Sequence, residues 1–418
     1  MSPRLTDEER GMLAGEAGPA AATALGILAG YAEALGAEAL LPIVGAHIDG
    51  CIFHGQASLD FVERFAAVGG RVRVPTTLNV GSIDLIHPGL IRLPDTEQAK
   101  PRRLMEAHEA LGCIPSFTCA PYQTMFRPQF GQQVAWGESN AIAFANSVIG
   151  ARTDRYGDFI DLCCALTGRA PAWGLHLDTN RRGRVLFRLA GFPASAEPGD
   201  ALYVAIGLLI GARSGDRVPV IEGLPPPRDE DQLKALGAAA ASSGSVGLFH
   251  IVGVTPEAPS LGDAFAGRQP EETIIVTPDD IAATLRQLSR APDGSPLTAI
   301  CLGTPHFSRA EWDRLLPLLR DMAPGRGIPI YVNTGRDTLR TLEAAGVLKG
   351  LDAARLIPVV DTCTYVTAIL ERLDGVVMTN SGKWAHYAPG NLGVRVAFGT
   401  VEDCIASAAT GRVIRVAR

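Results

Sequence analysis

Three of the eight cysteines lie in loops or at the ends of apolar runs, where a thiol is available for chemistry. Cys119 falls in the loop Thr118–Tyr122, Cys301 ends a predicted strand, and Cys363 directly follows another. Thiolates from distant segments are the soft ligands that an iron–sulfur cluster requires. Because the chain has no Cys-x-x-Cys pair, the spacing alone favours a plainer alternative, in which these are buried core cysteines.

The other five cysteines give a weaker signal. Cys163 and Cys164 lie in a helix-like run, and Cys113 and Cys404 also have the character of packing residues. Cys51 follows the segment His47-Ile48-Asp49-Gly50, and its role stays open.

A polar series interrupts a segment that is otherwise rich in Ala, Ile and Phe. Its members are Glu138, Asn146 and Arg152. Arginine forms paired hydrogen bonds with a carboxylate, so this series suggests a substrate-binding surface. A solvated helix face is the alternative, and the two interpretations stand about level because the polar residues do not keep to one helical face.

Several histidines and one polar turn add candidates for proton transfer and anion binding. His47, His176 and His306 lie in polar segments punctuated by glycine, although a lone histidine is more often a hydrogen-bonded structural residue. Thr379–Lys383 follows the predicted strand Val376–Met378, and backbone N–H groups of such a turn can bind an anion. The turn is not a Walker A motif, and the chain has neither GxGxxG nor GxSxG, which argues against dinucleotide enzymes and serine hydrolases.

Strands alternating with helices predict an α/β fold with parallel sheets. We expect an N-terminal α/β region at residues 1–222, carrying substrate loops, and a C-terminal α/β region at residues 223–418, carrying cluster loops. Gly223–Asp231 is the predicted linker. Ligands bind beyond the carboxyl ends of parallel strands, so one cleft should collect the polar loops.

Individual elements follow from caps and apolar periodicity. Helices are expected after the caps at Thr6, Thr277 and Ser308 and over Ala20–Leu41, Leu59–Ala67 and Arg336–Ala345. Strands are expected over Ile43–Ile48, Arg71–Pro75, Val246–Val254, Thr298–Leu302, Ile328–Val332, Arg355–Val360 and Val376–Met378.

Composition restricts the class of protein. The 418 residues are 47% hydrophobic and carry a net charge of -6, which does not suit a protein that binds the nucleic-acid backbone. No uncharged apolar run has the length of a membrane span. Met1–Arg10 is charged and polar, so we expect no secretion signal and a cytoplasmic protein with reduced thiols.

Several motifs, taken in order, resemble the large subunit, or catalytic part, of aconitase X. They are Thr76-Thr77 with Asn79, the run from Glu138-Ser139 through Asn146-Ser147 to Arg152-Thr153, Gly174–Leu177, Asp361–Cys363, and Thr379–Lys383 through His386-Tyr387. The resemblance extends from His47 to Gly411. It implies aconitase-like α/β layers around a central cleft, an iron–sulfur cluster, and a small swivelling domain that we expect as a separate partner subunit.

Two activities go with this family, dehydration of cis-3-hydroxy-L-proline and, in archaea, dehydration of mevalonate 5-phosphate. The phosphomevalonate type tends to carry a lysine where this chain has His54, and a cysteine before Pro-His where it has Thr304. The first difference removes a partner for phosphate. Both favour a small hydroxy acid of the hydroxyproline type. A non-catalytic binding or regulatory relative is the alternative from another class, although the catalytic loops are intact.

The resemblance also implies roles for individual residues. Cys119, Cys363 and, as third ligand, Cys301 would hold a 2Fe-2S, 3Fe-4S or 4Fe-4S cluster that acts as a Lewis acid. The base would be a serine of the small subunit. Residues expected to take part in the chemical step are His306, Lys383 and Ser381, and residues expected to bind substrate are His47, Asn79, Glu138, Asn146, Arg152 and His176.

Overall fold

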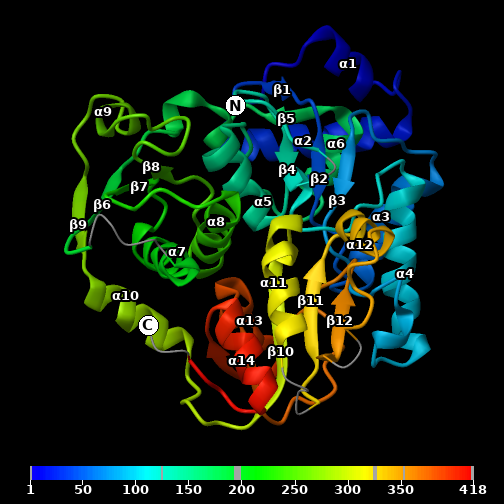
Figure 1. Ribbon diagram of the computed structural model, residues 1–418. Helices are drawn as coiled ribbons and strands as arrows, with labels where there is room; N and C mark the ends of the chain where they lie inside the picture. The colour runs from blue at the N-terminus through cyan, green and yellow to red at the C-terminus, as the bar shows by residue number, and fades with distance from the viewer. Residues whose placement is uncertain (1, 124–125, 193–198, 323–326, 352–353, 416–418) are drawn as a thin grey trace. The chain divides into compact units, whose positions relative to one another are not determined.

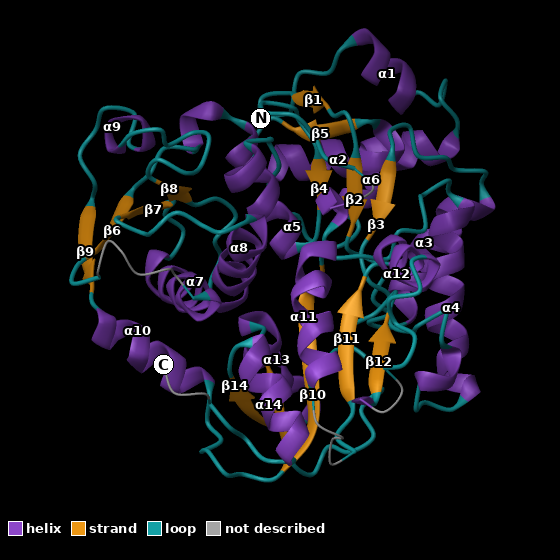
Figure 2. Ribbon diagram, viewed as in Figure 1, coloured by secondary structure: helices purple, strands orange, loops and turns teal. Residues whose placement is uncertain are grey.

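The computed structural model describes residues 2–123, 126–192, 199–322, 327–351 and 354–415. The chain divides into two compact units, each of α/β type (Figure 1, Figure 2). Unit 1 comprises Met1–Ile83, Leu93–Gly183 and Gly247–Arg268, and unit 2 comprises Asp84–Arg92, Arg184–Val246 and Gln269–Arg418. The predicted α/β class with several parallel sheets is confirmed.

Unit 1 contains a short parallel sheet in the order β3-β2-β4, formed by Thr76–Leu78, Ala46–Ile48 and Ala135–Trp136. Helix α6 (Ile160–Thr167) packs against this sheet and against α2 (Pro19–Leu35). The remaining elements are α1 (Asp7–Leu13), β1 (Leu40–Pro42), α3 (Gln56–Ala67), α4 (Asp95–Ala110), α5 (Ser139–Phe144), β5 (Arg169–Pro171), β8 (His250–Ile251) and α9 (Leu261–Ala264).

Unit 2 contains a five-stranded parallel sheet in the order β12-β11-β10-β13-β14. Its core includes the fully buried Trp312 and Phe307. The strands are β12 (Leu356–Val359), β11 (Ile330–Thr334), β10 (Leu297–Phe307), β13 (Val376–Thr379) and β14 (Arg395–Phe398). The helices that follow these strands are α11 (Arg309–Asp321), α12 (Arg336–Ala344), α13 (Gly382–Leu392) and α14 (Val401–Thr410).

A second layer of unit 2 has the parallel strands β7-β6-β9, formed by Pro219–Glu222, Val185–Leu189 and Glu272–Val276. Its helices are α7 (Asp200–Ser214), α8 (Glu230–Ser243) and α10 (Pro278–Leu288). Helices α7 and α8 approach closely because α7 carries glycine at the contact. A Cβ added to Gly207 would lie 2.3 Å from the carbonyl oxygen of Leu236, so no larger residue fits there.

The capping predictions are confirmed, because Thr6, Thr277 and Ser308 each form a capping box. The helix predicted over Ala20–Leu41 is shorter in the structure. Helix α2 ends at Leu35, where Gly36 takes the left-handed conformation, and residues 40–42 form β1.

Two predicted strands are also corrected. The expected strand Arg71–Pro75 is irregular, since Val72 and Arg73 donate to unrelated carbonyls, and the ladder begins only at Thr76. Within Val246–Val254 only His250–Ile251 is a strand, because the chain turns after it. Gly223–Asp231 contains the loop that joins β7 to α8 within unit 2, and the two-region division after residue 222 stays a prediction.

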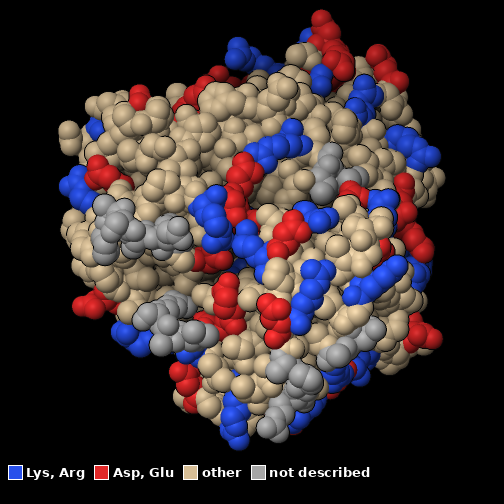
Figure 3. All heavy atoms as spheres, viewed as in Figure 1, with Lys and Arg blue, Asp and Glu red and all other residues tan. Residues whose placement is uncertain are grey.

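In the described part of the chain, no helix has the length and apolar character needed to cross a membrane. Basic side chains lie among acidic ones on the face drawn in Figure 3. In unit 2, Arg184 pairs with Glu271 and Arg217 pairs with Glu272, at 2.8 and 2.7 Å. Opposite charges are therefore neutralised locally along the β7-β6-β9 sheet.

Candidate active site

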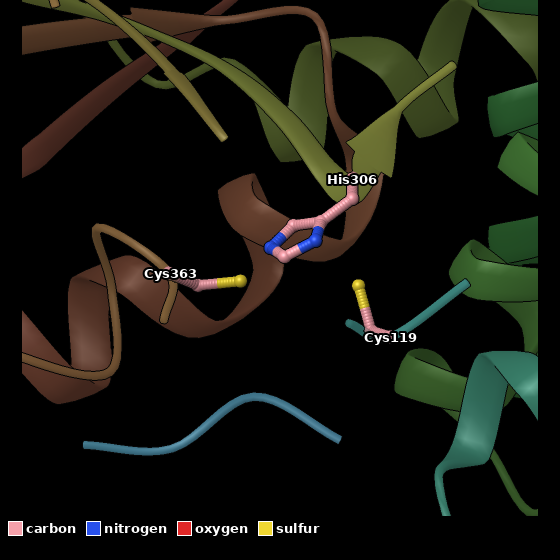
Figure 4. A group of neighbouring side chains, drawn as sticks. All are labelled: Cys119, His306 and Cys363. Atoms are coloured by element: carbon pink, nitrogen blue, oxygen red, sulfur yellow. The ribbon is translucent and has the colours of Figure 1, made fainter. Parts of the chain in front are cut away.

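His306 and Cys363 form a buried pair of metal-ligand side chains in unit 2. His306 lies near the end of β10, and Cys363 lies in the loop after β12. The two residues are 0% and 1% exposed, and a ring nitrogen of His306 lies within 4.8 Å of the Cys363 sulfur. Figure 4 shows the two side chains directed toward each other.

The orientation of His306 suits a metal ligand. Its Nε2 lies 3.3 Å from the carbonyl oxygen of Thr362, so the N–H donates there and the lone pair stays on Nδ1. Thiolate and imidazole both bind iron. The buried donors of unit 2 able to hold a metal are thus His306 and Cys363, Cys119 is a buried thiol of unit 1, and no disulfide is formed by the described cysteines. This donor set fits an iron-containing cofactor.

A buried lysine fixes the backbone of His306. Lys234 of α8 donates to the carbonyl oxygen of His306 at 3.2 Å, and it pairs with Asp231 at 2.9 Å and with Glu311. Burial by itself would lower the pKa of Lys234, but the two carboxylates raise it above its ordinary value. The amine therefore stays charged and holds the end of β10 in place.

Asp361 performs a similar task for the Cys363 loop. Its carboxylate accepts hydrogen bonds from Arg336 and from the backbone N–H of Leu85. Asp84 accepts from the N–H of Val360 at 3.1 Å. Burial raises the pKa of Asp361, and Arg336 opposes that shift. The loop that leads to Cys363 is therefore anchored at Val360 and at Asp361.

Cys301, the expected third ligand, is fully buried in β10, where it pairs with Tyr331 on one side and Thr379 on the other. Its thiol is hydrogen-bonded with Thr364, and burial raises its pKa to about 12. Among the described residues, Cys301 is not in the group that joins His306 and Cys363.

Ser381 and Lys383 lie at the start of α13. The hydroxyl of Ser381 donates to the carbonyl oxygen of Thr304 and accepts from the N–H of Trp384 at 3.0 Å. These contacts cap the helix and connect it to the part of β10 that directly precedes His306. Lys383, in the first turn, is 6% exposed. Their part in the chemical step stays a prediction.

Cys119 is held in unit 1 by an asparagine that the sequence analysis did not select. Asn140, in the first turn of α5, donates to the carbonyl oxygen of Cys119 at 3.1 Å and to the hydroxyl of Tyr122 at 3.0 Å. Lys234 of unit 2 was missed in the same way. No local motif marks either residue, because their partners are distant in sequence.

His47, Asn79 and Glu138 come together at the carboxyl end of the β3-β2-β4 sheet. His47 Nδ1 lies 2.8 Å from the Thr77 hydroxyl, and burial lowers the pKa of His47 to about 4, an effect that nearby Glu138 opposes. Asn79 donates to Asp49, and Glu138 caps α5 by accepting from the N–H of Ala141 at 2.6 Å.

Arg152 and Asn146 belong to a different, internally paired network of unit 1. Arg152 binds Asp178 at 2.9 Å and Glu257 at 3.1 Å, and Arg181 donates to Asn146 and Glu257. Asn146 in turn donates to the carbonyl oxygens of Thr153 and Gly247 at 2.9 and 2.8 Å. These contacts are structural, and a role of Arg152 or Asn146 in binding substrate stays a prediction.

His176 is similarly enclosed. Its Nδ1 lies 2.6 Å from the side-chain oxygen of Gln133, and its Nε2 bonds the hydroxyl of Tyr156. Burial, assisted by Arg181, lowers the pKa of His176 to about 3. The ring is neutral and both nitrogens have partners, and a role of His176 in binding substrate stays a prediction.

Sequence models of the three domains of aconitase X match the chain in order. The first, second and third domains cover residues 2–179, 183–286 and 297–410. Together these matches span almost the whole chain, which agrees with the extent of the resemblance seen in its motifs.

Individual relatives support the same assignment. The chain is 41% identical to cis-3-hydroxy-L-proline dehydratase of Pseudomonas aeruginosa, over 98% of this chain and 70% of that protein. It is 34% identical to the phosphomevalonate dehydratase large subunit of Methanosarcina mazei, over 98% of each. The crystal structure of Thermococcus kodakaraensis aconitase X in its holo form covers 97% of this chain and all of its own, with a TM-score of 0.85 and 32% identity. The chain therefore belongs to the aconitase X family and is a dehydratase.

Proposed function

We propose that this chain is the large, cofactor-bearing part of a dehydratase that removes water from cis-3-hydroxy-L-proline. The observation that carries this proposal is the higher identity to the hydroxyproline enzyme, 41% against 34% for the phosphomevalonate large subunit of M. mazei. The presence of His54 and Thr304, where the phosphomevalonate type tends to carry lysine and cysteine, supports the same choice.

The proposed cofactor is an iron–sulfur cluster with Cys119 and Cys363 as ligands, together with Cys301 or His306. Cys301 follows from the resemblance, whereas His306 is supported by its nearness to Cys363. When bound, such a cluster supplies Lewis acidity that makes the substrate hydroxyl a better leaving group. Lys234 and Asp361 would keep the ligand loops in place through the hydrogen bonds that they form.

The reaction breaks the C–O bond at carbon 3 and the C–H bond alpha to the carboxylate. The products are water and a cyclic enamine acid, which tautomerises to the imine. We propose that a serine of a small partner subunit takes the alpha proton. The partner is proposed because the chain aligns with 98% of a relative named as a large subunit. Lys383, in the first turn of α13, is the proposed cation for developing negative charge.

The first test is a dehydration assay of the anaerobically purified protein with its small subunit, using cis-3-hydroxy-L-proline and mevalonate 5-phosphate separately. We expect brown protein, and turnover of hydroxyproline at least about 100-fold faster in kcat/KM, a difference of about 2.7 kcal/mol. Colourless protein with full activity would refute the cluster. Turnover of mevalonate 5-phosphate alone would establish the second candidate, which the end-to-end match to the large subunit favours.

A second experiment identifies the third ligand. Cys301→Ala and His306→Ala are compared with Cys404→Ala, a fully buried core cysteine of unit 2, as the matched control. Iron and sulfide per chain and the visible spectrum should stay unchanged in the control. Of the two test variants, the one that removes a ligand loses most of its iron, whereas the other keeps it. Retention of iron in both variants would contradict either assignment.

A further inference from the structure

The carboxyl end of the β3-β2-β4 sheet carries buried hydrogen-bond acceptors that the described residues leave unused. These atoms are Nε2 of His47, Oδ1 of Asn79 and Oδ1 of Asn140. The three residues are 0%, 3% and 0% exposed. A buried acceptor without a partner costs free energy, so a folded protein tolerates several together only where something else supplies the hydrogens.

Strand register places most of this group on one face of the sheet. His47 pairs with Thr77 on one side and with Trp136 on the other. Side chains alternate between faces, so residues two positions further along each chain continue the same face beyond the strand ends. Asp49, Asn79 and Glu138 are those residues, which explains why Asn79 reaches Asp49 and why Glu138 acts on His47.

The hydrogen bonds of Asn79 and Asn140 determine that their unused amide oxygens are acceptors, whereas the indole N–H of Trp136 is a donor without a partner among the described residues. Thr77 has a single hydroxyl hydrogen, and we assign it to the carbonyl oxygen of Ala46 at 3.4 Å, which makes His47 Nδ1–H the donor to Thr77 at 2.8 Å. The lone pair of His47 is therefore on Nε2. Asn79 must present its NH₂ to the carboxylate of Asp49, and Asn140 must present its NH₂ to the carbonyl of Cys119, which leaves each amide oxygen unused.

We propose that this face of unit 1 is an ammonium-binding subsite, in which His47 Nε2 and the Asn79 amide oxygen accept hydrogen bonds from a protonated amine of the substrate. The carboxylates of Asp49 and Glu138, just beyond the ends of β2 and β4, supply negative charge on the same face. Acceptors and carboxylates attract a cation and repel a phosphate or a second carboxylate.

This subsite deepens the proposed function, on which it rests, by explaining the choice of substrate. The ring nitrogen of 3-hydroxyproline is a secondary ammonium with two N–H groups. Mevalonate 5-phosphate has no nitrogen and would bring a dianion to the same atoms. His47 is thus a specificity-determining residue, because it accepts a hydrogen bond from the substrate nitrogen.

The test compares two unreactive ligands of equal size, L-proline and cyclopentanecarboxylate, in which a CH₂ replaces the ammonium. Binding to the full-length holoenzyme is measured by calorimetry at pH 7.5. We expect wild type to bind proline about 10- to 100-fold more tightly, as suits hydrogen bonds that involve a charged group. In His47→Leu the preference should fall to within a few-fold, while the affinity for cyclopentanecarboxylate stays unchanged.

Binding of the carbocyclic acid is the internal control for folding. Thr77→Val, which keeps the shape of the side chain but frees Nδ1, is the second variant, and it should weaken the preference without abolishing it. His108→Leu, a buried histidine on α4 that bonds the Leu104 carbonyl, should retain the wild-type preference.

Failure of this inference differs from failure of the proposed function. If wild type dehydrates cis-3-hydroxy-L-proline but binds both acids equally, or binds neither, the ammonium subsite is refuted and the function stands. An unchanged proline preference in His47→Leu also refutes it. If the preference is present and depends on His47 but hydroxyproline is not dehydrated, the subsite stands and the substrate is a different amino acid.

Discussion

At the carboxyl end of the large sheet in unit 2, Asn333 donates to the Leu302 carbonyl and accepts from the N–H of Thr364. Trp384 donates to the Thr364 hydroxyl at 3.0 Å. At the corresponding end of the sheet in unit 1, His47, Asn79 and Asn140 each keep an unused acceptor among the described residues. The unused atoms of unit 2 include the hydroxyls of Thr304, Thr362 and Thr367, which can donate as well as accept, and the sheet of unit 1 also leaves the indole N–H of Trp136 unused among the described residues.

The polar groups at these two sheet ends therefore have different functions. In unit 2, they position backbone around His306 and Cys363, so that soft ligands keep their geometry. In unit 1, one polar atom of His47 and one of Asn79 are hydrogen-bonded within the protein, and we propose that the other binds a ligand. Stability should therefore respond to changes in unit 2, and ligand selectivity to changes in unit 1.

The largest effect on stability is expected for Lys234→Met in unit 2. It leaves Glu311 and Asp231 without their buried cation, which typically costs about 3–5 kcal/mol. Arg309→Ala, which removes an exposed ion pair with Asp313, should cost less than about 0.5 kcal/mol. Urea unfolding measures both values. A loss in Lys234→Met no greater than that in His47→Leu would remove the contrast between the units.

A smaller effect, on iron affinity, is expected where a polar group holds the loop that carries a proposed cofactor ligand. Asp361→Ala frees the loop before Cys363 from Arg336 and Leu85, so iron affinity should fall about 10- to 100-fold. Iron retained after competition with a chelator gives the measurement. Asp374→Ala, which alters an exposed pair with Arg372, is the control and should retain iron as wild type does.

The pH dependence of stability should have opposite signs at two histidines. Burial lowers the pKa of His108 in unit 1 to about 4, from 6.5. Between those values the unfolded chain binds a proton that the folded chain does not, so wild type loses about 1.4 kcal/mol per pH unit as the pH falls from 6.5 to 4. The variant His108→Gln lacks this contribution. If the free energy of unfolding of wild type and of His108→Gln changed equally with pH between 6.5 and 4.5, this prediction would be wrong.

The smallest effect is expected at His87 of unit 2. The hydrogen bond to Asp84 raises the pKa of His87, so its contribution to stability is fully present below pH 6.5 and disappears as the pH rises through the folded-state value. The ring is partly exposed, so solvent screening keeps this contribution small. A His87→Gln variant that lost more stability at pH 8 than at pH 6 would reverse the expected sign.

Much of the molecule is determined locally by the sequence. Capping boxes at Thr6, Thr277 and Ser308 begin helices because their partners lie three residues away, and the strands that lead to Cys301 and Cys363 follow from apolar runs. The motifs were also enough to identify the family, because their order does not depend on how the chain folds.

Only the tertiary structure decided which polar residues act together. His306 meets Cys363 from 57 positions away, Lys234 reaches the His306 carbonyl from helix α8, and Arg152 turns inward to Glu257. The unused lone pair of His47 likewise depends on a hydroxyl 30 positions away. A hydrogen bond is decided by distance and direction in space, and residue type and spacing along the chain specify neither for partners on separate strands.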